Sequence, residues 1–269
     1  MIPYNDITAW GVLHPWPTRE QVEQDMLLSK AICDIFSDER LSDELVFRGG
    51  TALNKLILKE PYRYSEDLDF VRTSSGGIGD IMKALTELGN ASGYHVKTRI
   101  GQFPKVYWLT KAQTGREVRI KIEINTYERS FALPIINVRH TINSSWYTTS
   151  ADVPIFQNEE IAATKLRALY QRSKGRDLFD LWLLTNEINV DTELVREVFT
   201  AYRPPGYTGK KAIENLEEKL RDAMFRKDIN NMISPRMTTF NPDSAAEIII
   251  QKYLIDTYSC VHSSFKNGS

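Results

Sequence analysis

Two carboxylates stand two positions apart where the sequence predicts a strand. Asp67 and Asp69 lie within the segment 65–71, and Ser65 stands two positions before Asp67. Because side chains alternate across a strand, all three would point to the same face. Like charges side by side repel unless a cation compensates them, and Mg²⁺ prefers a few carboxylate oxygens together with substrate phosphates. The pair is therefore a candidate metal site, and a solvated strand edge is the alternative.

Two adjacent glycines and a threonine precede that pair. Gly49, Gly50 and Thr51 follow a short apolar strand and open a helix. Glycine lets the backbone approach a ligand closely, and a helix N-terminus presents free N–H groups to an anion. The motif predicts a phosphate cradle to which Thr51 adds a hydroxyl. The structural alternative is a tight turn capped by Thr51; the carboxylates one helix away favour the cradle.

A third carboxylate lies on the clearest strand of the sequence. Residues 117–125 alternate between branched apolar side chains on one face and charged or amide side chains on the other. Glu123 belongs to the polar face, where it would complete a set of three metal ligands or act as a base for an attacking hydroxyl. Pairing with Lys121 or Arg119 across a wet face is the alternative.

A lysine and two aspartates follow in the second half of the chain. Lys165 lies on a helix with a partly apolar stripe, which suits a phosphate contact, although most such lysines extend to solvent. Asp177 and Asp180 open a helix that is apolar nearly all round, so both need partners. Helix N-terminal amides suit Asp177, and Arg172 or Arg176 suits Asp180. These contacts could be purely structural clamps between two helices.

Periodicity and turn residues predict the elements that hold these residues. We expect strands at 45–47, 65–71, 94–100, 106–110 and 117–125. We expect helices at 18–36, 51–59, 81–92, 158–172, 177–186, 191–202, 210–226 and 242–257, the first opened by a capping box. Residues 1–17 predict an irregular arm anchored by Trp10 and Trp16, and residues 130–157 predict loop and short strand.

This order of elements predicts two parts. The chain is α/β up to about residue 155 and helical after it, so we expect an α/β lobe at 1–155 and an all-helical lobe at 156–269. A length of 269 residues suits one large domain or two modest ones.

The composition is that of a soluble globular protein, and the net charge of −1 excludes a chain that binds nucleic acid through its overall charge. Cys33 and Cys260 are far apart and predict neither a metal site nor a disulfide framework. Neither a signal peptide nor a membrane span is expected, so we expect a cytoplasmic protein.

Together these motifs resemble the nucleotidyltransferase-like AbiEii toxins, which include the mycobacterial MenT toxins, within the DNA polymerase β-like nucleotidyltransferase superfamily. The resemblance is carried by Phe47-Arg-Gly-Gly-Thr-Ala-Leu53, Tyr64-Ser-Glu-Asp-Leu-Asp-Phe70, Lys121-Ile-Glu-Ile-Asn125, Glu160-Ile-Ala-Ala-Thr-Lys-Leu-Arg-Ala-Leu169 and Arg176-Asp-Leu-Phe-Asp-Leu-Trp182. It covers residues 47–182 in blocks and the remainder only in general architecture.

The resemblance implies a bilobed protein, with a mixed sheet in a nucleotidyltransferase-fold lobe and a helical lobe after it. Asp67, Asp69 and Glu123 would bind Mg²⁺ or Mn²⁺ carried by a nucleoside triphosphate. The residues Gly49, Gly50, Thr51, Ser65 and Lys165 would contact its phosphates, and Asp177 would be the essential carboxylate of the last motif. Glutamate rather than aspartate at 123 leaves open whether this residue is a ligand or a base.

The resemblance also implies a toxin of a toxin–antitoxin pair. It would move a nucleoside monophosphate from an NTP to an RNA acceptor, expected to be the 3′ end of tRNA, and so block translation. The densest basic run would track the RNA through Arg167, Arg172, Lys174 and Arg176. The expected partner is a cognate antitoxin that is a DNA-binding repressor. The alternatives are transfer to a protein hydroxyl or a small molecule, and a module that binds a nucleotide or partner without catalysis.

Overall fold

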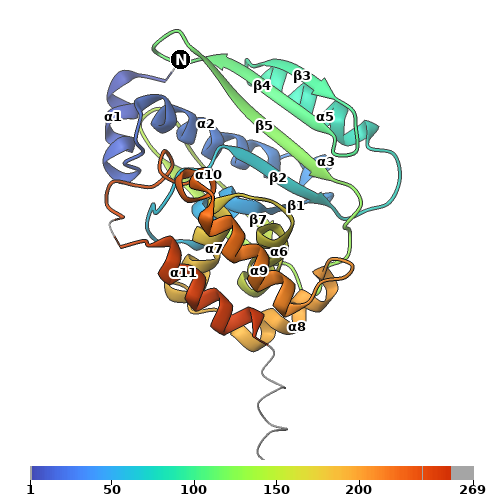
Figure 1. Cartoon of the computed structure of the whole chain (residues 1–269). Coiled ribbons are helices and arrows are strands. Elements are labelled where there is room, and N and C mark those ends of the chain that lie inside the picture. Colours follow the sequence, from blue (N-terminus) through green and yellow to red (C-terminus); the bar gives the residue numbers. More distant parts are fainter. Residues whose placement is uncertain (1, 238, 256–269) are drawn as a thin grey trace, which may run out of the picture. The chain divides into compact units, whose positions relative to one another are not determined.

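The computed structural model of the chain describes residues 2–237 and 239–255 (Figure 1). They form two compact units. Unit 1 contains residues 2–157 together with 231–237, and unit 2 contains residues 158–230 together with 239–255. Each unit is described by itself below.

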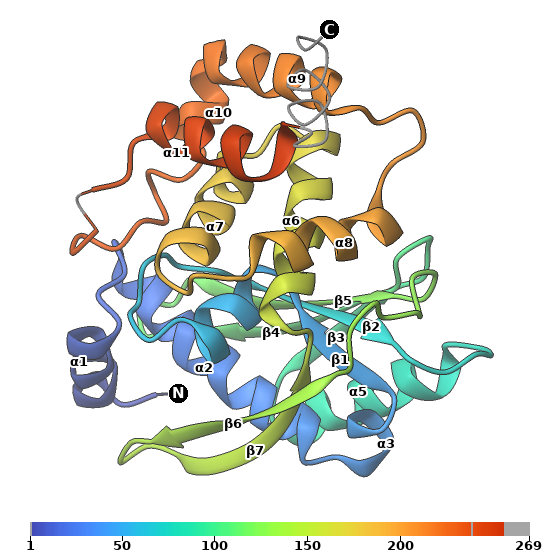
Figure 2. The same cartoon turned by 90° about the horizontal axis from the view of Figure 1, so that it is seen from below.

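Unit 1 is built on one mixed sheet of seven strands in the order β3-β4-β5-β2-β1-β7-β6 (Figures 1 and 2). The strands are β1 (Leu45–Arg48), β2 (Asp67–Arg72), β3 (His95–Arg99), β4 (Lys105–Lys111), β5 (Glu117–Asn125), β6 (Ile136–Asn143) and β7 (Thr148–Ile155). The pairs β2–β5 and β1–β7 are parallel and the others antiparallel, which confirms the predicted mixed sheet.

The helical segments of unit 1 are α1 (Tyr4–Leu13), α2 (Arg19–Phe36), α3 (Glu39–Ser42), α4 (Gly49–Ala52), the π-helical turn η1 (Leu53–Ile57) and α5 (Gly79–Ala91). The predicted capping box is present at the start of α2, where Thr18 accepts from the Gln21 N–H and Gln21 accepts from the Thr18 N–H. Helix α2 packs on the hairpin of β6 and β7, beside which it lies in Figure 2.

The described part of unit 2 contains α6 (Asn158–Gln171), α7 (Gly175–Asn186), α8 (Thr192–Tyr202), α9 (Gly209–Arg221), α10 (Ala223–Lys227), α11 (Pro242–Ile249) and the π-helical turn η2 (Ile250–Leu254). Helix α7 buries Leu178, Phe179, Leu181 and Leu184 completely, as its apolar sequence predicts. The last part of the helix predicted to reach residue 257, and Cys260, lie outside the described residues. Within the described ranges, no helix combines the length and the apolar character needed to cross a membrane.

The N-terminal region differs from the expected irregular arm. Residues 4–13 form α1, which follows Pro3 in an extended conformation and buries Ile7. The Trp10 indole N–H donates to Asp25 Oδ2 of α2 at 2.8 Å, and Trp16 is buried. Helix formation here depends on packing against α2, a tertiary contact that outweighs the weak local periodicity.

Residues 130–157 also differ, because β6 and β7 are eight residues each and pair along their whole length. Buried and exposed residues alternate along the second half of β7, as in a strand. The sequence does not show this alternation clearly, because polar residues lie on both faces. The segment predicted as one helix at 210–226 is two helices, separated at Asp222, whose side chain accepts from the Met224 N–H and caps α10.

Residues 231–237, which the sequence division assigns to the second lobe, lie in unit 1. The Tyr64 N–H donates to the Met232 carbonyl at 2.7 Å, and the Ser234 N–H donates to the Tyr62 carbonyl at 2.9 Å. The distant segment therefore pairs with the loop that leads into β2.

A buried ion pair joins α2 to η1. Lys55 Nζ lies 2.5 Å from Asp25 Oδ2, and both side chains are almost fully buried. Burial opposes ionisation of Asp25, but Lys55 outweighs it and holds the pKa of this carboxyl below its ordinary value. Because η1 continues directly from α4, the pair fixes the helix that begins at Gly49.

We expect Lys55→Met to lower the free energy of unfolding by about 3–5 kcal/mol, because it leaves Asp25 buried without its cation. Urea unfolding followed by tryptophan fluorescence measures this change. The matched control is Lys59→Met at an exposed position nearby, with an expected change within about 0.5 kcal/mol. Equal unfolding midpoints for the two variants would contradict the role of the pair.

Candidate active site

Three carboxylates of unit 1 share one face of the sheet. In the parallel pair β2–β5, Asp67 lies opposite Lys121 and Asp69 lies opposite Glu123. Residues opposite each other in register point to the same face, as do residues two apart on one strand. The predicted set Asp67, Asp69 and Glu123 is thus gathered on neighbouring strands.

This crowding changes how easily the carboxyls ionise. Burial of the Asp69 carboxyl, and then repulsion from Asp67, raise the pKa of Asp69 above its ordinary value. Arg48, opposite Asp69 on β1, opposes the shift. The raised pKa means that the ionised form of Asp69 is less favourable here than in water. A cation bound beside the carboxyl would make that form more favourable.

Lys121 supplies positive charge within the group. Its Nζ lies 2.9 Å from Asp67 Oδ2 and 3.3 Å from Glu123 Oε2, and Lys105 Nζ lies 3.2 Å from Glu123 Oε2. Burial lowers the pKa of Lys121, but the contact with Asp67 outweighs it and the pKa is raised. The pairing of Glu123 with Lys121, the alternative contact recognised in the sequence, is therefore present.

The donor set fits a divalent metal ion in its chemistry. Among residues 2–237 and 239–255, no three His, Cys, Asp or Glu side chains are arranged to hold a metal ion together. Asp67, Asp69 and Glu123 nevertheless offer the carboxylate oxygens that Mg²⁺ and Mn²⁺ prefer. An ammonium group already bridges two of them, which indicates that the group attracts a cation.

The glycine motif approaches these carboxylates closely. Gly49 begins α4 with a φ of +83°, and a Cβ at this position would lie 2.7 Å from Asp69 Oδ2. A Cβ at Gly50 would lie 3.1 Å from Ser65 Oγ and would also clash with the Arg63 guanidinium. Only glycine satisfies both the backbone angle and the space at position 49.

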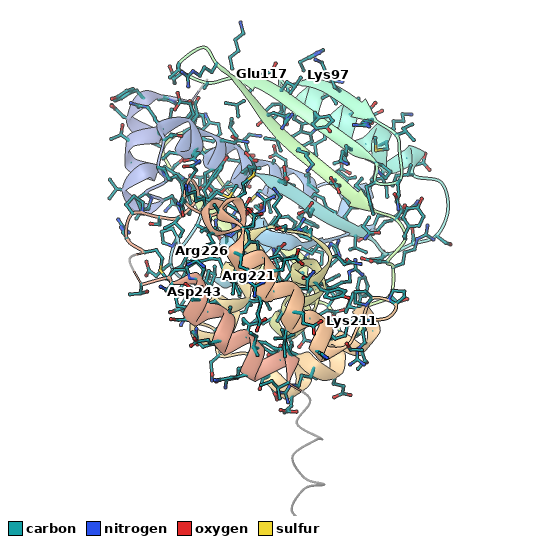
Figure 3. The ribbon with its side chains drawn as sticks, in the orientation of Figure 1. Lys97, Glu117, Lys211, Arg221, Arg226 and Asp243 are labelled. Carbon is teal, nitrogen blue, oxygen red and sulfur yellow. The ribbon has the colours of Figure 1, made fainter. Side chains whose placement is uncertain are left out.

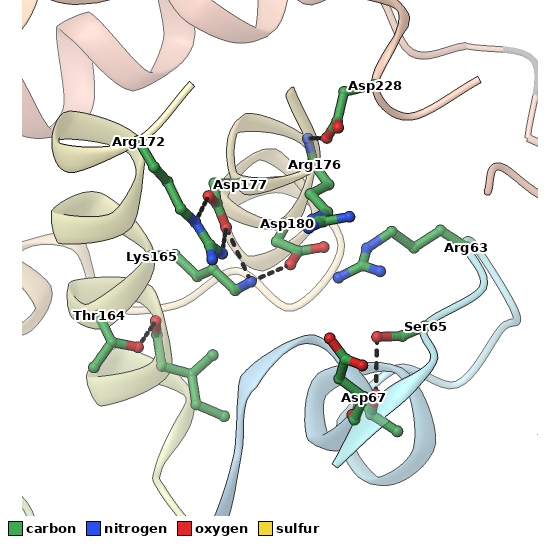
Figure 4. A network of polar contacts seen from close by, with 12 residues as sticks. Arg63, Ser65, Asp67, Thr164, Lys165, Arg172, Arg176, Asp177, Asp180 and Asp228 are labelled. Carbon is green, nitrogen blue, oxygen red and sulfur yellow. Dashed lines mark hydrogen bonds and ion pairs between the residues drawn. The ribbon is translucent and has the colours of Figure 1, made fainter. Parts of the chain in front are cut away.

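Thr51 and Ser65 lock the motif to the strand that carries the aspartates. The buried Thr51 hydroxyl lies 2.8 Å from Ser65 Oγ and also contacts the Asp67 carbonyl oxygen (Ser65 and Asp67 are labelled in Figure 4). Arg63 is buried beside Gly50 and donates to the Tyr64 carbonyl. Unit 1 thus brings Gly49, Gly50, Thr51 and Ser65 together with the carboxylates.

Unit 2 holds a second polar cluster between α6 and α7. Lys165 Nζ lies 2.6 Å from Asp180 Oδ2 and 3.3 Å from Asp177 Oδ1, and all three side chains are buried (Figure 4). The Arg172 guanidinium donates to both oxygens of Asp177 at 2.7 and 2.9 Å. The spacing of these residues along two packed helices makes the cluster a clamp between them.

The other basic residues predicted to bind RNA also have contacts inside unit 2. Lys174 Nζ lies 3.6 Å from Asp228 Oδ1. The backbone N–H of Arg176 donates to Asp228 Oδ2 (Figure 4). The Arg167 guanidinium lies 5.8 Å from the centre of the Tyr202 ring. Each of these contacts helps to fix the local structure.

Sequence reasoning missed Lys219 of α9. Its ammonium donates to the carbonyls of Leu169 and Tyr170 at the end of α6, the latter at 3.0 Å, and burial lowers its pKa to about 8. A basic residue in the last turn of an amphipathic helix is an ordinary surface feature, so nothing in the sequence distinguishes it.

The chain is similar to known proteins in sequence and in fold. The family model described as nucleotidyl transferase AbiEii toxin, type IV toxin–antitoxin system, matches residues 30–251. Among solved structures, the chain is similar to MenT4, a nucleotidyltransferase toxin from Mycobacterium tuberculosis, with a TM-score of 0.63 and 16% identity; the match covers 95% of this chain and 92% of that chain. A nucleotidyltransferase-like antigenic protein from Paracoccidioides brasiliensis matches with a TM-score of 0.43 and 16% identity, over 88% of this chain and 95% of that chain. No curated protein matches the sequence. The likeness to MenT4 shows a shared fold.

We expect Gly49→Ala to destabilise the protein more than Gly115→Ala does. Both glycines have a φ near +80°, so each alanine pays a backbone cost of about 1–2 kcal/mol. A Cβ at Gly115 meets no atom within 4 Å, whereas a Cβ at Gly49 meets Asp69. Urea unfolding gives the difference, and a crystal structure of Gly49→Ala should show a displaced Asp69 carboxylate. If both variants lose the same free energy of unfolding, the close approach of Gly49 to Asp69 does not affect stability.

We expect Lys165→Met to lower the free energy of unfolding by about 3–5 kcal/mol, because it removes a cation from two buried carboxylates. The control Lys174→Met breaks a partly exposed pair and should cost at most about 1 kcal/mol. Thermal unfolding measures both changes, and a smaller loss for Lys165→Met would contradict the clamp.

The same clamp sets a pH dependence. Burial opposes ionisation of Asp177, but Lys165 and Arg172 outweigh it, so its pKa lies below the ordinary value. The contribution of Asp177 to the free energy of unfolding is therefore fully present above the ordinary pKa of an aspartate. It is lost as the pH falls through the lowered pKa of Asp177 in the folded protein.

Proposed function

The chain belongs to the AbiEii nucleotidyl transferase toxin family of type IV toxin–antitoxin systems, and on that premise we propose that it transfers a nucleoside monophosphate from an NTP to RNA. It is a nucleotidyltransferase, so the alternative of a binding module without catalysis is set aside. The proposed acceptor is the 3′ end of tRNA, whose modification would block translation. The observation that carries the proposal is the grouping of Asp67, Asp69 and Glu123 beside the Gly49–Thr51 turn.

In the proposed reaction, the acceptor hydroxyl oxygen bonds to the α-phosphorus, the bond from that phosphorus to the bridging oxygen breaks, and pyrophosphate leaves. When bound to Asp67, Asp69 and Glu123, Mg²⁺ or Mn²⁺ would neutralise charge on the triphosphate and polarise the reacting phosphate. Gly49 and Gly50 let the backbone approach the Asp69 carboxylate and the Arg63 guanidinium closely, and Ser65 offers a hydroxyl beside Gly50. Glu123 serves as a ligand or accepts the proton of the attacking hydroxyl.

The residues of unit 2 have proposed roles at the triphosphate. Lys165 provides a point charge, and Asp177 holds that charge in one position through the contact at 3.3 Å. Arg167, Arg172, Lys174 and Arg176 remain proposed RNA contacts. A lysine held by carboxylates loses little side-chain freedom when it meets a ligand, which supports this use of Lys165.

Membership of the family implies an antitoxin partner. We propose that this antitoxin is a DNA-binding repressor and that the toxin acts in the cytoplasm, where both NTPs and tRNA are present.

We expect Asp69→Asn to lower the rate of transfer by roughly 10²–10³-fold, or about 2.7–4 kcal/mol in activation free energy, because an amide binds a divalent cation poorly. The control is Asp152→Asn, an exposed carboxylate on β7. The measurement follows each of the four α-³²P-labelled NTPs, in the presence of Mg²⁺, onto total tRNA, protein and small acceptors.

Label on tRNA that depends on Asp69 is the expected result. Label that remains on protein or small molecules would overturn the RNA acceptor in favour of the other two acceptor classes. Full transfer by Asp69→Asn would show that the catalytic group lies elsewhere.

A further inference from the structure

Strands β3, β4 and β5 of unit 1 present two very different faces. Apart from Tyr107 and Leu109, their apolar side chains point to the side covered by α5 and α2. Trp108 is fully buried there, and its indole N–H donates to the Leu85 carbonyl of α5 at 3.1 Å. The opposite face carries Lys97, Arg99, Lys111 and Arg119, all exposed (Figure 3 labels Lys97 of β3 and Glu117 of β5). We call this opposite face the open face of β3–β5.

The open face continues into the catalytic carboxylates through two cross-strand rows. One row runs from Arg99 through Lys105 and Glu123 to Asp69. The next row runs from Lys97 through Tyr107 and Lys121 to Asp67. Because residues in register point to one face, each row forms a continuous line of side chains from the sheet edge to a carboxylate.

The charge on this face is strongly positive. It carries Lys97, Arg99, Lys105, Lys111, Arg119 and Lys121 against Glu117 and Glu123. Lys105 and Lys121 pair with carboxylates at the row ends, whereas Lys97, Arg99, Lys111 and Arg119 form no ion pair with another described residue. The overall net charge of the chain is −1, so the positive charge of this face is a local feature.

An aromatic ring and a hollow lie within the same face. The Arg119 guanidinium lies 5.6 Å from the centre of the Tyr107 ring. A hollow of about 240 Å³ is lined by Gln24, Glu66, Asp67, Glu117 and Arg119. The hollow therefore places Asp67 in one depression with Arg119 and with two further carboxylates, Glu66 and Glu117.

We propose that the open face of β3–β5 binds the phosphate backbone of the RNA acceptor and leads its end to Asp67 and Asp69. The inference rests on the proposed function, because it supplies the acceptor side of the same site. Cations that form no ion pair bind phosphates without first losing one, and an aromatic ring among them can stack on an unpaired base. An acidic protein partner needs the cations but not the connection to the carboxylates, so RNA is the better fit.

The test compares two triple variants that remove the same positive charge. The first is Lys97→Gln/Arg99→Gln/Arg119→Gln on the open face. The control is Lys83→Gln/Lys210→Gln/Lys211→Gln, at exposed positions on α5 and α9. Thermal unfolding establishes that both variants are folded, and fluorescence polarisation measures binding to tRNA and to a single-stranded RNA labelled at its 5′ end, over a series of salt concentrations.

For the open-face variant we expect RNA affinity to fall by roughly 10–100-fold at low salt, and the slope of log K against log salt to shrink by about 2, or about 0.7 for each lost phosphate contact. The KM for RNA should rise and the KM for NTP should stay unchanged. The control variant should match the wild type in all of these measurements.

Three outcomes would overturn the inference. If the open-face variant binds and labels RNA as the control does, the proposed function stands and the surface is wrong. If the control variant loses as much RNA affinity as the open-face variant does, the loss reflects overall charge and not this face. If the wild type labels protein or a small molecule and binds no RNA, the proposed function fails and this inference fails with it.

Discussion

Repulsion among carboxylates on neighbouring parallel strands is the constraint on which the site of unit 1 depends. Asp67, Asp69 and Glu123 are placed on one face by strand register, and no local adjustment separates them while β2 and β5 remain paired. Lys121 relieves part of the repulsion, and Arg48 relieves part of it from the other side. Burial first, and then repulsion from Asp67, still raises the pKa of Asp69, so further positive charge beside this carboxyl would favour its ionised form.

Buried ion pairs hold the surrounding elements. Asp25–Lys55 fixes η1 behind the glycine turn in unit 1, and Lys165 with Asp177 and Asp180 joins α6 to α7 in unit 2. Such pairs add little net stability compared with well-packed apolar side chains, but losing one partner is costly. Their value here is that each fixes one geometry, so that groups with proposed roles at the phosphates cannot shift independently of the fold.

The features of this site that a sequence can predict are those set by a local repeat of residue types, such as the two-residue alternation of a strand. The alternation in residues 117–125 gave β5 with its observed bounds, and the spacing of Asp67 and Asp69 placed both on one face. The pairing of β2 with β5, the contacts of Lys121 and the register that extends the carboxylates to β3 depend on residues far apart in the chain, which no local pattern encodes. Helix α1 was missed for the same reason, since Trp10 finds its partner, Asp25, only after α2 has folded.

The pairing of residues 231–237 with the loop before β2 has a consequence for how the protein is made. The Tyr64 N–H reaches its acceptor only when Met232 is present, and Tyr62 likewise waits for Ser234. A chain emerging from the ribosome therefore exposes all three carboxylates and the glycine turn long before the loop beside them can close. Unit 1 is completed only when most of the chain has been synthesised, so an unfinished chain carries the site residues without the structure that holds them.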